Sequence, residues 1–214
     1  MGYDVRNWFI NAAETHIHCD GITELINWLD TSTDFFTAPA STRFHSSHPG
    51  GLSHHSINVY TQLVKIYTGD TALRKALDGI TFESIAKVAL FHDVCKVNCY
   101  KDSYRNVKHY IDYPTEDYEE WQIKHDDLGY YVWKSEKIYV YDDDYPLGHG
   151  EKSLYLLNQF IPVTKNEAIA IRYHMGAFRT EDVKILSQVF EKYPLSLALH
   201  MADMIATNCM EVKE

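Results

Sequence analysis

The sequence lacks the features of a membrane-spanning or secreted protein. No more than four apolar residues follow one another anywhere in its 214 residues, as in Val88–Phe91, whereas a membrane-spanning helix needs about 20. Asp4, Arg6 and Glu14 interrupt the apolar start that a secretory signal requires. We therefore expect a cytoplasmic protein that does not enter a membrane.

Cysteine is also scarce. The four cysteines are too few for a disulfide framework in a chain of 214 residues, so we expect reduced thiols. Cys95 and Cys99 are one helical turn apart, while Cys19 and Cys209 are distant. A zinc site made by Cys95, Cys99 and a histidine stays open, although the sequence offers no second closely spaced pair of ligands.

Positively charged residues are also few. Lys and Arg total 20 against 30 Asp and Glu, which gives a net charge of −10 and argues against a general binder of nucleic acid or acidic membranes. A small anionic ligand remains compatible with this charge. Because no repeat or Gly/Ser-rich linker divides the chain and 45% of its residues are hydrophobic, we expect a single domain over residues 1–214.

Helical periodicity dominates both ends of the chain, and the expected class is an all-α bundle with a β-hairpin insertion around residues 117–142. Residues 1–50 supply N-terminal helices and a connection, 51–105 and 147–214 supply the helices of the bundle, and 106–146 form the insertion. The expected hairpin strands are 130–133 and 137–141, joined by Lys134–Glu136. The expected helices are 5–13, 22–29, 53–67, one that starts near Thr81 and carries Asp93, 149–160, 164–176, 181–192 and 194–210.

The insertion is rich in aromatic residues. They could form a lid that stacks a base over a pocket, or they could pack a small core of the hairpin's own. The residues concerned are Trp121, Tyr130, Tyr131 and Trp133.

Twelve histidines are present, and some of them follow the apolar rows of the expected helices. Asp93, His174 and Asp203 lie on apolar rows of three helices, His55 borders a fourth, and His92 adjoins Asp93. An unpaired charge at such a position costs several kcal/mol, so these groups either pair with one another or surround a cation. Imidazole and carboxylate together suit a transition metal, and a carboxylate can bridge two ions.

This ordered set of residues resembles the HD-domain metal-dependent phosphohydrolases. The resemblance rests on the Gly50–Ser56 segment with His55, on His92-Asp93 followed by Lys96, on Leu147-Gly148-His149, on His174-Met175-Gly176, and on Asp203. Within this superfamily, the motifs are most similar to those of the HD-domain 3′-to-5′ exoribonuclease branch. That branch carries an N-terminal oligonucleotide-binding domain, for which the residues before His55 leave no room, and it has His-His-Gly where this chain has His174-Met175-Gly176.

The resemblance implies a centre of one or two divalent ions. His55, His92, Asp93 and Asp203 would hold one ion, and His149 and His174, with Asp93 bridging, would complete a second position. The ion could be Mn, Fe, Co, Ni, Mg or Zn. Asp93 and Lys96 are the expected catalytic residues, with Lys96 neutralising charge on phosphorus or protonating the leaving oxygen.

Four further side chains are candidates for substrate contacts, although each could equally be surface charge or part of a loop: Arg43, His45, Arg105 and Lys152. The expected activity is hydrolysis of a small nucleotide or related phosphoester by a metal-dependent enzyme. Three alternatives stay open, namely a 3′-to-5′ exonuclease on single-stranded nucleic acid, a di-iron oxygenase on the same scaffold and a nucleotide sensor without catalysis.

Overall fold

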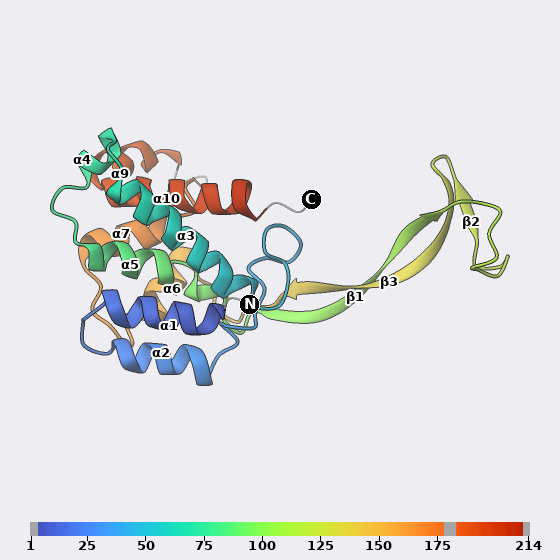
Figure 1. Ribbon diagram of the computed structural model, residues 1–214, viewed down its shortest axis with the longest axis horizontal. Helices are drawn as coiled ribbons and strands as arrows, with labels where there is room; N and C mark the ends of the chain where they lie inside the picture. The colour runs from blue at the N-terminus through green and yellow to red at the C-terminus, as the bar shows by residue number, and fades with distance from the viewer. Residues whose placement is uncertain (1–3, 178–182, 212–214) are drawn as a thin grey trace.

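The computed structural model describes residues 4–177 and 183–211. Helices pack into a body, from which a long β-ribbon projects as an arm (Figure 1). The helices of the body are α1 (Val5–His16), α2 (Ile22–Thr31), α3 (Gly51–Thr68), α4 (Ala72–Ala76), α5 (Phe82–Phe91), α6 (His149–Leu157), α7 (Lys165–Tyr173), α9 (Leu186–Lys192) and α10 (Pro194–Ile205), with a 3₁₀ turn η1 (Val94–Lys96) and a π-helical turn η2 (Ala206–Met210). None of the helices in these described ranges is long and apolar enough to cross a membrane.

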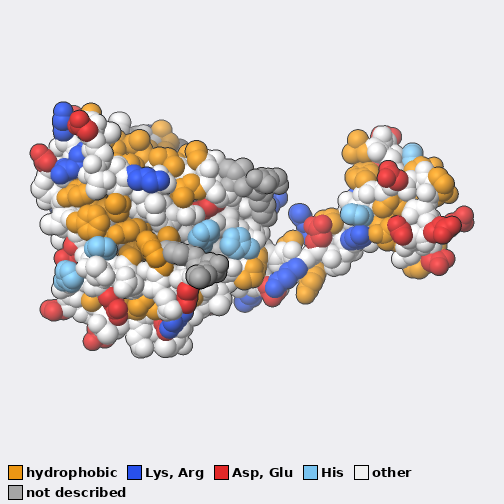
Figure 2. Space-filling model, viewed as in Figure 1, with side chains coloured by type: hydrophobic (Ala, Val, Ile, Leu, Met, Phe, Trp, Pro, Cys, Tyr) orange, Lys and Arg blue, Asp and Glu red, His pale blue; other side chains and the backbone are white. Residues whose placement is uncertain are grey.

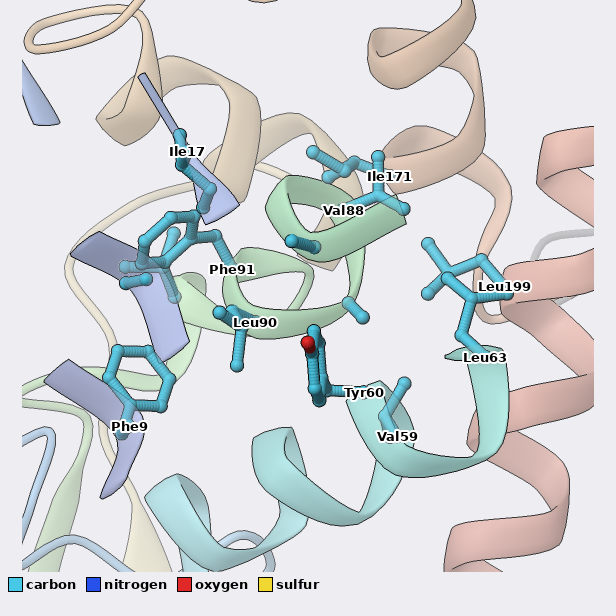
Figure 3. Close-up of a cluster of buried hydrophobic side chains, with 14 of the residues drawn as sticks. Phe9, Ile17, Val59, Tyr60, Leu63, Val88, Leu90, Phe91, Ile171 and Leu199 are labelled. Atoms are coloured by element: carbon cyan, nitrogen blue, oxygen red, sulfur yellow. The ribbon is translucent and has the colours of Figure 1, made fainter. Parts of the chain in front are cut away.

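The core of the body lies where α3 packs against α5 and α10. Leu63 of α3 contacts Leu199 of α10 there, and Val88 of α5 lies between α3 and Ile171 of α7 (Figure 3). Phe9 of α1 packs on the side of the core that faces α1. All five side chains are fully buried. The apolar rows read from the sequence therefore do form the core, which is why polar groups on the same rows end up buried.

The predicted helix starts at Thr81 and Thr164 are confirmed. The Thr81 hydroxyl accepts a hydrogen bond from the backbone N–H of Ser84. Thr164 and Glu167 form a reciprocal capping box, in which each side chain accepts a hydrogen bond from the other residue's backbone N–H. α4 was not predicted, and part of the predicted helix 181–192 lies outside the described residues.

The helix that was expected to run through Asp93 ends earlier. α5 stops at Phe91, and Asp93 has φ −107° and ψ 18° before the chain enters the 3₁₀ turn η1. This bridge-region conformation changes the direction of the chain and is common at functional positions. The side chains of residues 93–96 consequently do not follow an α-helical spacing.

Two glycines allow backbones to approach closely beside the buried histidines. A Cβ atom on Gly51 would lie 1.9 Å from the carbonyl oxygen of Ser46, and one on Gly150 would lie 2.6 Å from the Cα atom of Arg172. Only glycine fits at either position. Gly51 seats the loop before α3 against the helix start, and Gly150 lets α6 contact α7 at the level of His149.

The expected all-α class is wrong, because the chain has mixed α/β structure with a three-stranded antiparallel sheet in strand order β1-β3-β2. The strands are β1 (Tyr100–Ile111), β2 (Lys124–Asp126) and β3 (Gly129–Tyr141). β3 pairs with β1 over twelve residues, from Tyr100↔Tyr141 to Ile111↔Tyr130. The two predicted strands 130–133 and 137–141 are thus one strand, and Lys134–Glu136 is not a turn.

The wrong fold class and the wrong turn have the same physical cause. Most side chains of β1 and β3 are exposed, so these strands have no buried face and do not need the apolar alternation that marks an ordinary strand. Residues 134–136 contain no glycine, proline or asparagine, the residues that a tight hairpin turn favours.

The aromatic residues near the end of the arm pack on one another. Tyr113 stacks on Tyr130 with ring centroids 4.2 Å apart, and Tyr131 contacts Tyr110 and Trp133. This part of the arm points away from the helical body (Figure 1). These rings contact one another but remain largely exposed, as does Trp121, so they form no buried core, and their position does not support a base-stacking lid over the body.

Candidate metal centre

His55 is anchored on α3 by a carboxylate that the sequence analysis did not identify. Its side chain is fully buried, and its Nδ1 lies 3.1 Å from Oε1 and 3.2 Å from Oε2 of Glu211. Asn58 and Ser46 also donate hydrogen bonds to Glu211 and hold it in place. Because a carboxylate accepts hydrogen bonds, a neutral His55 ring carries its proton on Nδ1 and its lone pair on Nε2.

His92 and His174 are held in the same tautomer. Each follows the last residue of its helix, and each Nδ1 lies against a backbone carbonyl, 2.8 Å from that of Ala89 for His92 and 2.7 Å from that of Ile171 for His174. A carbonyl can only accept, so both Nδ1 atoms are donors. The Nε2 atom of a neutral ring therefore carries a lone pair in all three histidines.

These lone pairs point toward one another and toward two carboxylates. His55 Nε2 lies 3.3 Å from His92 Nε2, 3.3 Å from Asp203 Oδ1 and 3.6 Å from Asp93 Oδ2. His174 Nε2 lies 3.3 Å from Asp93 Oδ1, yet it is buried and makes no hydrogen bond. Lone pairs in contact repel unless a cation lies among them, either a proton or a metal ion.

The spacing of these atoms fits a metal ion. Ligand atoms about 2.0–2.2 Å from one transition-metal ion are about 3–3.5 Å apart from each other in tetrahedral or octahedral geometry. The contacts among His55, His92, Asp93 and Asp203 are 3.3–3.6 Å long. The described residues thus contain buried His and Asp groups that could hold a metal ion, among them His55 with His92 and Asp203, and Asp93 with His92 and His174.

The pKa shifts of the buried histidines are consistent with a cation at this centre. Burial disfavours the charged form of His55, but hydrogen bonds to Asp203 and Glu211 outweigh it and raise its pKa to about 9. Burial also opposes protonation of His174, and the adjoining Asp93 carboxylate nevertheless raises its pKa. The pKa of His92, in contrast, is lowered by burial to about 4. The centre therefore attracts cations.

A second group of potential ligands adjoins Asp93 on its other side. His149, at the start of α6, and Cys95, in η1, join Asp93 in a set whose ligand atoms all lie within 4.8 Å of one another. Cys95 Sγ is 3.6 Å from His149 Nδ1 and 4.0 Å from Asp93 Oδ1. Cys99 is not in this set, since its thiol donates to the carbonyls of Cys95 and Val97 and contacts Lys152.

Lys96 lies at the same centre, as expected. Its ammonium is 2.7 Å from Asp93 Oδ2, and the side chain is buried. Burial lowers the pKa of Lys96, but the Asp93 charge outweighs this and raises it above the ordinary value, so the group is a cation at neutral pH. Lys96 also lines a pocket of about 140 Å³ together with His45, Asp93, His174 and Asp203. Histidine side chains reach the surface of the body near the base of the arm (Figure 2).

His45 contributes to this pocket from the loop before α3. Its ring centroid is 4.9 Å from that of His55, and its Nε2 is buried without a hydrogen-bond partner. Burial lowers the pKa of His45 to about 4, so the ring is neutral at physiological pH. A neutral imidazole with an unused nitrogen is suited to contact a polar ligand in the pocket.

The other three candidates for substrate contacts lie elsewhere. Arg43 and Arg105 line a separate pocket of about 410 Å³ between the loop before α3 and the base of the arm. Lys152 is buried against Asp143, 2.8 Å from its Oδ1, in a third pocket that Cys99 also lines. Lys152 is thus neither surface charge nor part of the lining of the pocket beside the metal centre.

His200 contacts the backbone at His174. Its Nδ1 donates to the carbonyl of His174 at 2.6 Å, so it supports the backbone that carries a potential ligand rather than Asp203. The residues that the sequence analysis missed are Glu211 and, as a partner of His149, Cys95. Glu211 follows the last apolar row of the chain, with no motif to mark it.

Comparisons with protein-family models, with curated proteins and with solved structures found no match to this chain.

Proposed function

We propose that this protein is a divalent-metal-dependent phosphohydrolase with an HD-type centre that acts on a small nucleotide or a related phosphoester. The observation that carries the proposal is the convergence of three buried imidazoles, each with Nδ1–H anchored and Nε2 free to bind, on the carboxylates of Asp93 and Asp203. Bound divalent ions would supply a Lewis acid for a phosphoryl oxygen and would lower the pKa of a water molecule. The order of these residues in the chain resembles that of the HD-domain phosphohydrolases.

Lys96 favours phosphoryl chemistry over other metal chemistry. Its buried ammonium lines the pocket and contacts Asp93, so it provides positive charge where phosphoryl oxygens would lie. An ammonium can also hold and deliver the proton that a leaving oxygen needs. His45, with its unused Nε2 in the same pocket, would orient the phosphoester.

The size and charge of the site favour a small substrate. A pocket of about 140 Å³ accommodates a phosphate group and a few neighbouring atoms, and the net charge of the chain is −10. A strand of nucleic acid would need a continuous cationic track. One observation favours the exonuclease as a second candidate: Arg43 and Arg105 line the larger pocket beside the arm, where a longer anionic substrate could extend.

The test is a hydrolysis screen over mono-, di-, tri- and cyclic nucleotides that measures free phosphate, pyrophosphate and nucleotide products, performed on chelator-treated protein reloaded with Mn, Mg, Co or Ni. We expect metal-dependent release, and the reaction in ¹⁸O-labelled water should place the label on phosphate. A short RNA oligomer included in the screen decides between the two candidates, because an exonuclease would degrade it with a higher kcat/KM than any mononucleotide and would lose activity steeply with salt.

Two results would overturn the proposal. Metal-loaded protein that hydrolyses no phosphoester, measured by free phosphate, pyrophosphate and nucleotide products together, would overturn the assignment as an enzyme. Turnover that requires iron and O₂, with the label entering from the gas, would leave the ligands standing and replace hydrolysis by oxygenation.

A further inference from the structure

Cys95 is the unusual member of the second ligand group. Its side chain is fully buried, it forms no disulfide, and its Sγ lies between His149 Nδ1 at 3.6 Å and Asp93 Oδ1 at 4.0 Å. A buried thiol in a purely structural role is surrounded by apolar groups and behaves as a small hydrophobe. Here the thiol faces an imidazole and a carboxylate, both of which bind metals.

The local backbone places the thiol there. In an α-helix, residues two positions apart point to different sides, so a continuous helix would separate Asp93 from Cys95. The bridge-region conformation of Asp93 and the 3₁₀ turn that follows remove this separation. Ser153 then fixes the turn, because its hydroxyl donates to the carbonyl of His92 and accepts from the backbone N–H of Cys95.

An independent observation points to a cation at the same place. Asp93 Oδ1, the oxygen that faces the thiol, also faces Nε2 of His174 at 3.3 Å. That nitrogen belongs to a fully buried ring whose Nδ1 already donates to a carbonyl, and it has no hydrogen-bond partner. A cation that contacts Asp93 Oδ1 would satisfy the orphaned nitrogen, and this oxygen belongs to the same ligand group as the sulfur.

The spacing is consistent with ligation. With a metal–sulfur distance of about 2.3 Å and a metal–nitrogen distance of about 2.0–2.1 Å, sulfur and nitrogen ligands of a tetrahedral ion are about 3.5 Å apart. The observed Cys95–His149 distance is 3.6 Å. The Cys95–Asp93 distance of 4.0 Å is longer and corresponds to a wider angle at the ion.

We propose that Cys95 is a thiolate ligand of the second metal position, beside His149, His174 and the bridging Asp93, and that this position takes a thiophilic divalent ion (Zn, Co, Fe or Ni) in preference to Mg or Mn. The inference rests on the metal centre of the proposed function and adds the class of ion. On binding, the thiol proton is released to solvent and a metal–sulfur bond forms, with no change of oxidation state. The two positions are then unequal, since the described residues place no sulfur beside His55 and Asp203.

Cobalt spectroscopy on the full chain tests this inference. Co(II) bound through a thiolate shows a sulfur-to-cobalt charge-transfer band in the near ultraviolet, which His and Asp ligands do not produce. We expect this band in the wild type and in Cys99→Ser, the matched control for a nearby buried cysteine outside the ligand set. Cys95→Ser should still bind cobalt but lack the band.

Metal preference gives a second readout. Removing a side chain that is hydrogen-bonded to a metal ligand lowers metal affinity by about 10- to 100-fold. Loss of a sulfur atom that binds the metal directly should lower the zinc affinity of the second position by at least as much. Manganese affinity should change far less. The ratio of the two affinities is therefore the quantity to compare between the wild type and Cys95→Ser.

The outcomes separate this inference from the proposed function. Cobalt binding without the band in the wild type, or an unchanged band in Cys95→Ser, would overturn thiolate ligation and leave the metal centre intact. Failure of the wild type to bind any cobalt would overturn both. If Cys95→Ser does not fold, a variant with Cys95 as its only cysteine decides, because the inference requires that variant to keep the band and loss of the band refutes it.

Discussion

Glu211 offers a sharp test of how the centre is organised, because it contacts no expected reacting atom and yet fixes His55. Its carboxylate accepts hydrogen bonds from His55 Nδ1 at 3.1 Å, from Asn58 at 2.9 Å and from Ser46 at 2.7 Å. Burial raises the pKa of Glu211, but the hydrogen bond from His55 outweighs this and lowers it to about 2, so the carboxylate is charged at neutral pH. It holds the His55 lone pair on Nε2 and increases the basicity of the ring.

We predict that Glu211→Ala weakens metal binding by about 100-fold and Glu211→Gln by about 10-fold, the range found when a partner of a ligating histidine is removed. These losses correspond to about 2.7 and 1.4 kcal/mol of binding free energy. Glutamine causes the smaller loss because its carbonyl oxygen can still accept from His55 Nδ1. It is still weaker than glutamate, because its NH2 group cannot accept the hydrogen bond from either Asn58 or Ser46, whichever it faces, and because it carries no charge.

Competition with a metal-sensitive dye measures these affinities, and the exposed Glu191→Ala on α9 serves as the control. The ¹⁵N chemical shifts of His55 in the zinc-loaded protein report its tautomer independently. Affinity of Glu211→Ala within twofold of the wild type, or a His55 ring that is protonated on Nε2 in the zinc-loaded wild type, would refute the tautomer argument on which the centre is built.

Three further outcomes follow from the same geometry. Lys96→Ala should retain bound metal and lose about 10²-fold or more in turnover. The control Lys87→Ala also removes a buried lysine, and the folded fraction of that variant should turn over at the wild-type rate. Leu63→Ala should lower the free energy of unfolding in urea by about 2–5 kcal/mol, because it opens a cavity in the fully buried core, and a loss below 1 kcal/mol would place Leu63 outside it. Lys152→Met should destabilise by about 1–3 kcal/mol by leaving the mostly buried Asp143 carboxylate without its ammonium, with metal binding unchanged; reduced metal affinity would instead connect Lys152 to the centre.

The sequence predicted the buried His and Asp groups well, for a simple reason. His55, Asp93, His174 and Asp203 lie on or beside apolar helical rows, and those rows form the core of the body, so their polar members are buried together. The capping box at Thr164 was equally readable, because both of its hydrogen bonds join residues three positions apart.

The arm could not be predicted from the same kind of pattern. Its strands β1 and β3 are largely exposed, so neither shows a period of apolar residues, and their pairing joins Tyr100 to Tyr141 across a long stretch of chain. The sequence did show an aromatic insertion with β-rich runs. It did not show that β1 begins as early as Tyr100, because several charged and polar residues separate the tyrosines there.

Glu211, and the grouping of Cys95 with His149 and Asp93 instead of with Cys99, escaped prediction because both depend on departures from helical geometry. The 3₁₀ turn after Asp93 rotates Cys95 toward His149, and the π-helical turn Ala206–Met210 brings Glu211 back over α3. Periodicity arguments assume a regular helix and cannot anticipate either event.

The most direct test of the central claim is the metal content of the purified protein, measured by elemental analysis after equilibration with zinc or cobalt and removal of free ions. The convergence of the Nε2 atoms of His55, His92 and His174 on Asp93 and Asp203 predicts at least one tightly bound ion per chain. It also predicts complete loss of that ion in Asp93→Ala, with the helical circular-dichroism spectrum retained. A folded wild-type protein that binds no ion would contradict the account and would mean that protons on His55 and His174 alone neutralise the buried carboxylates.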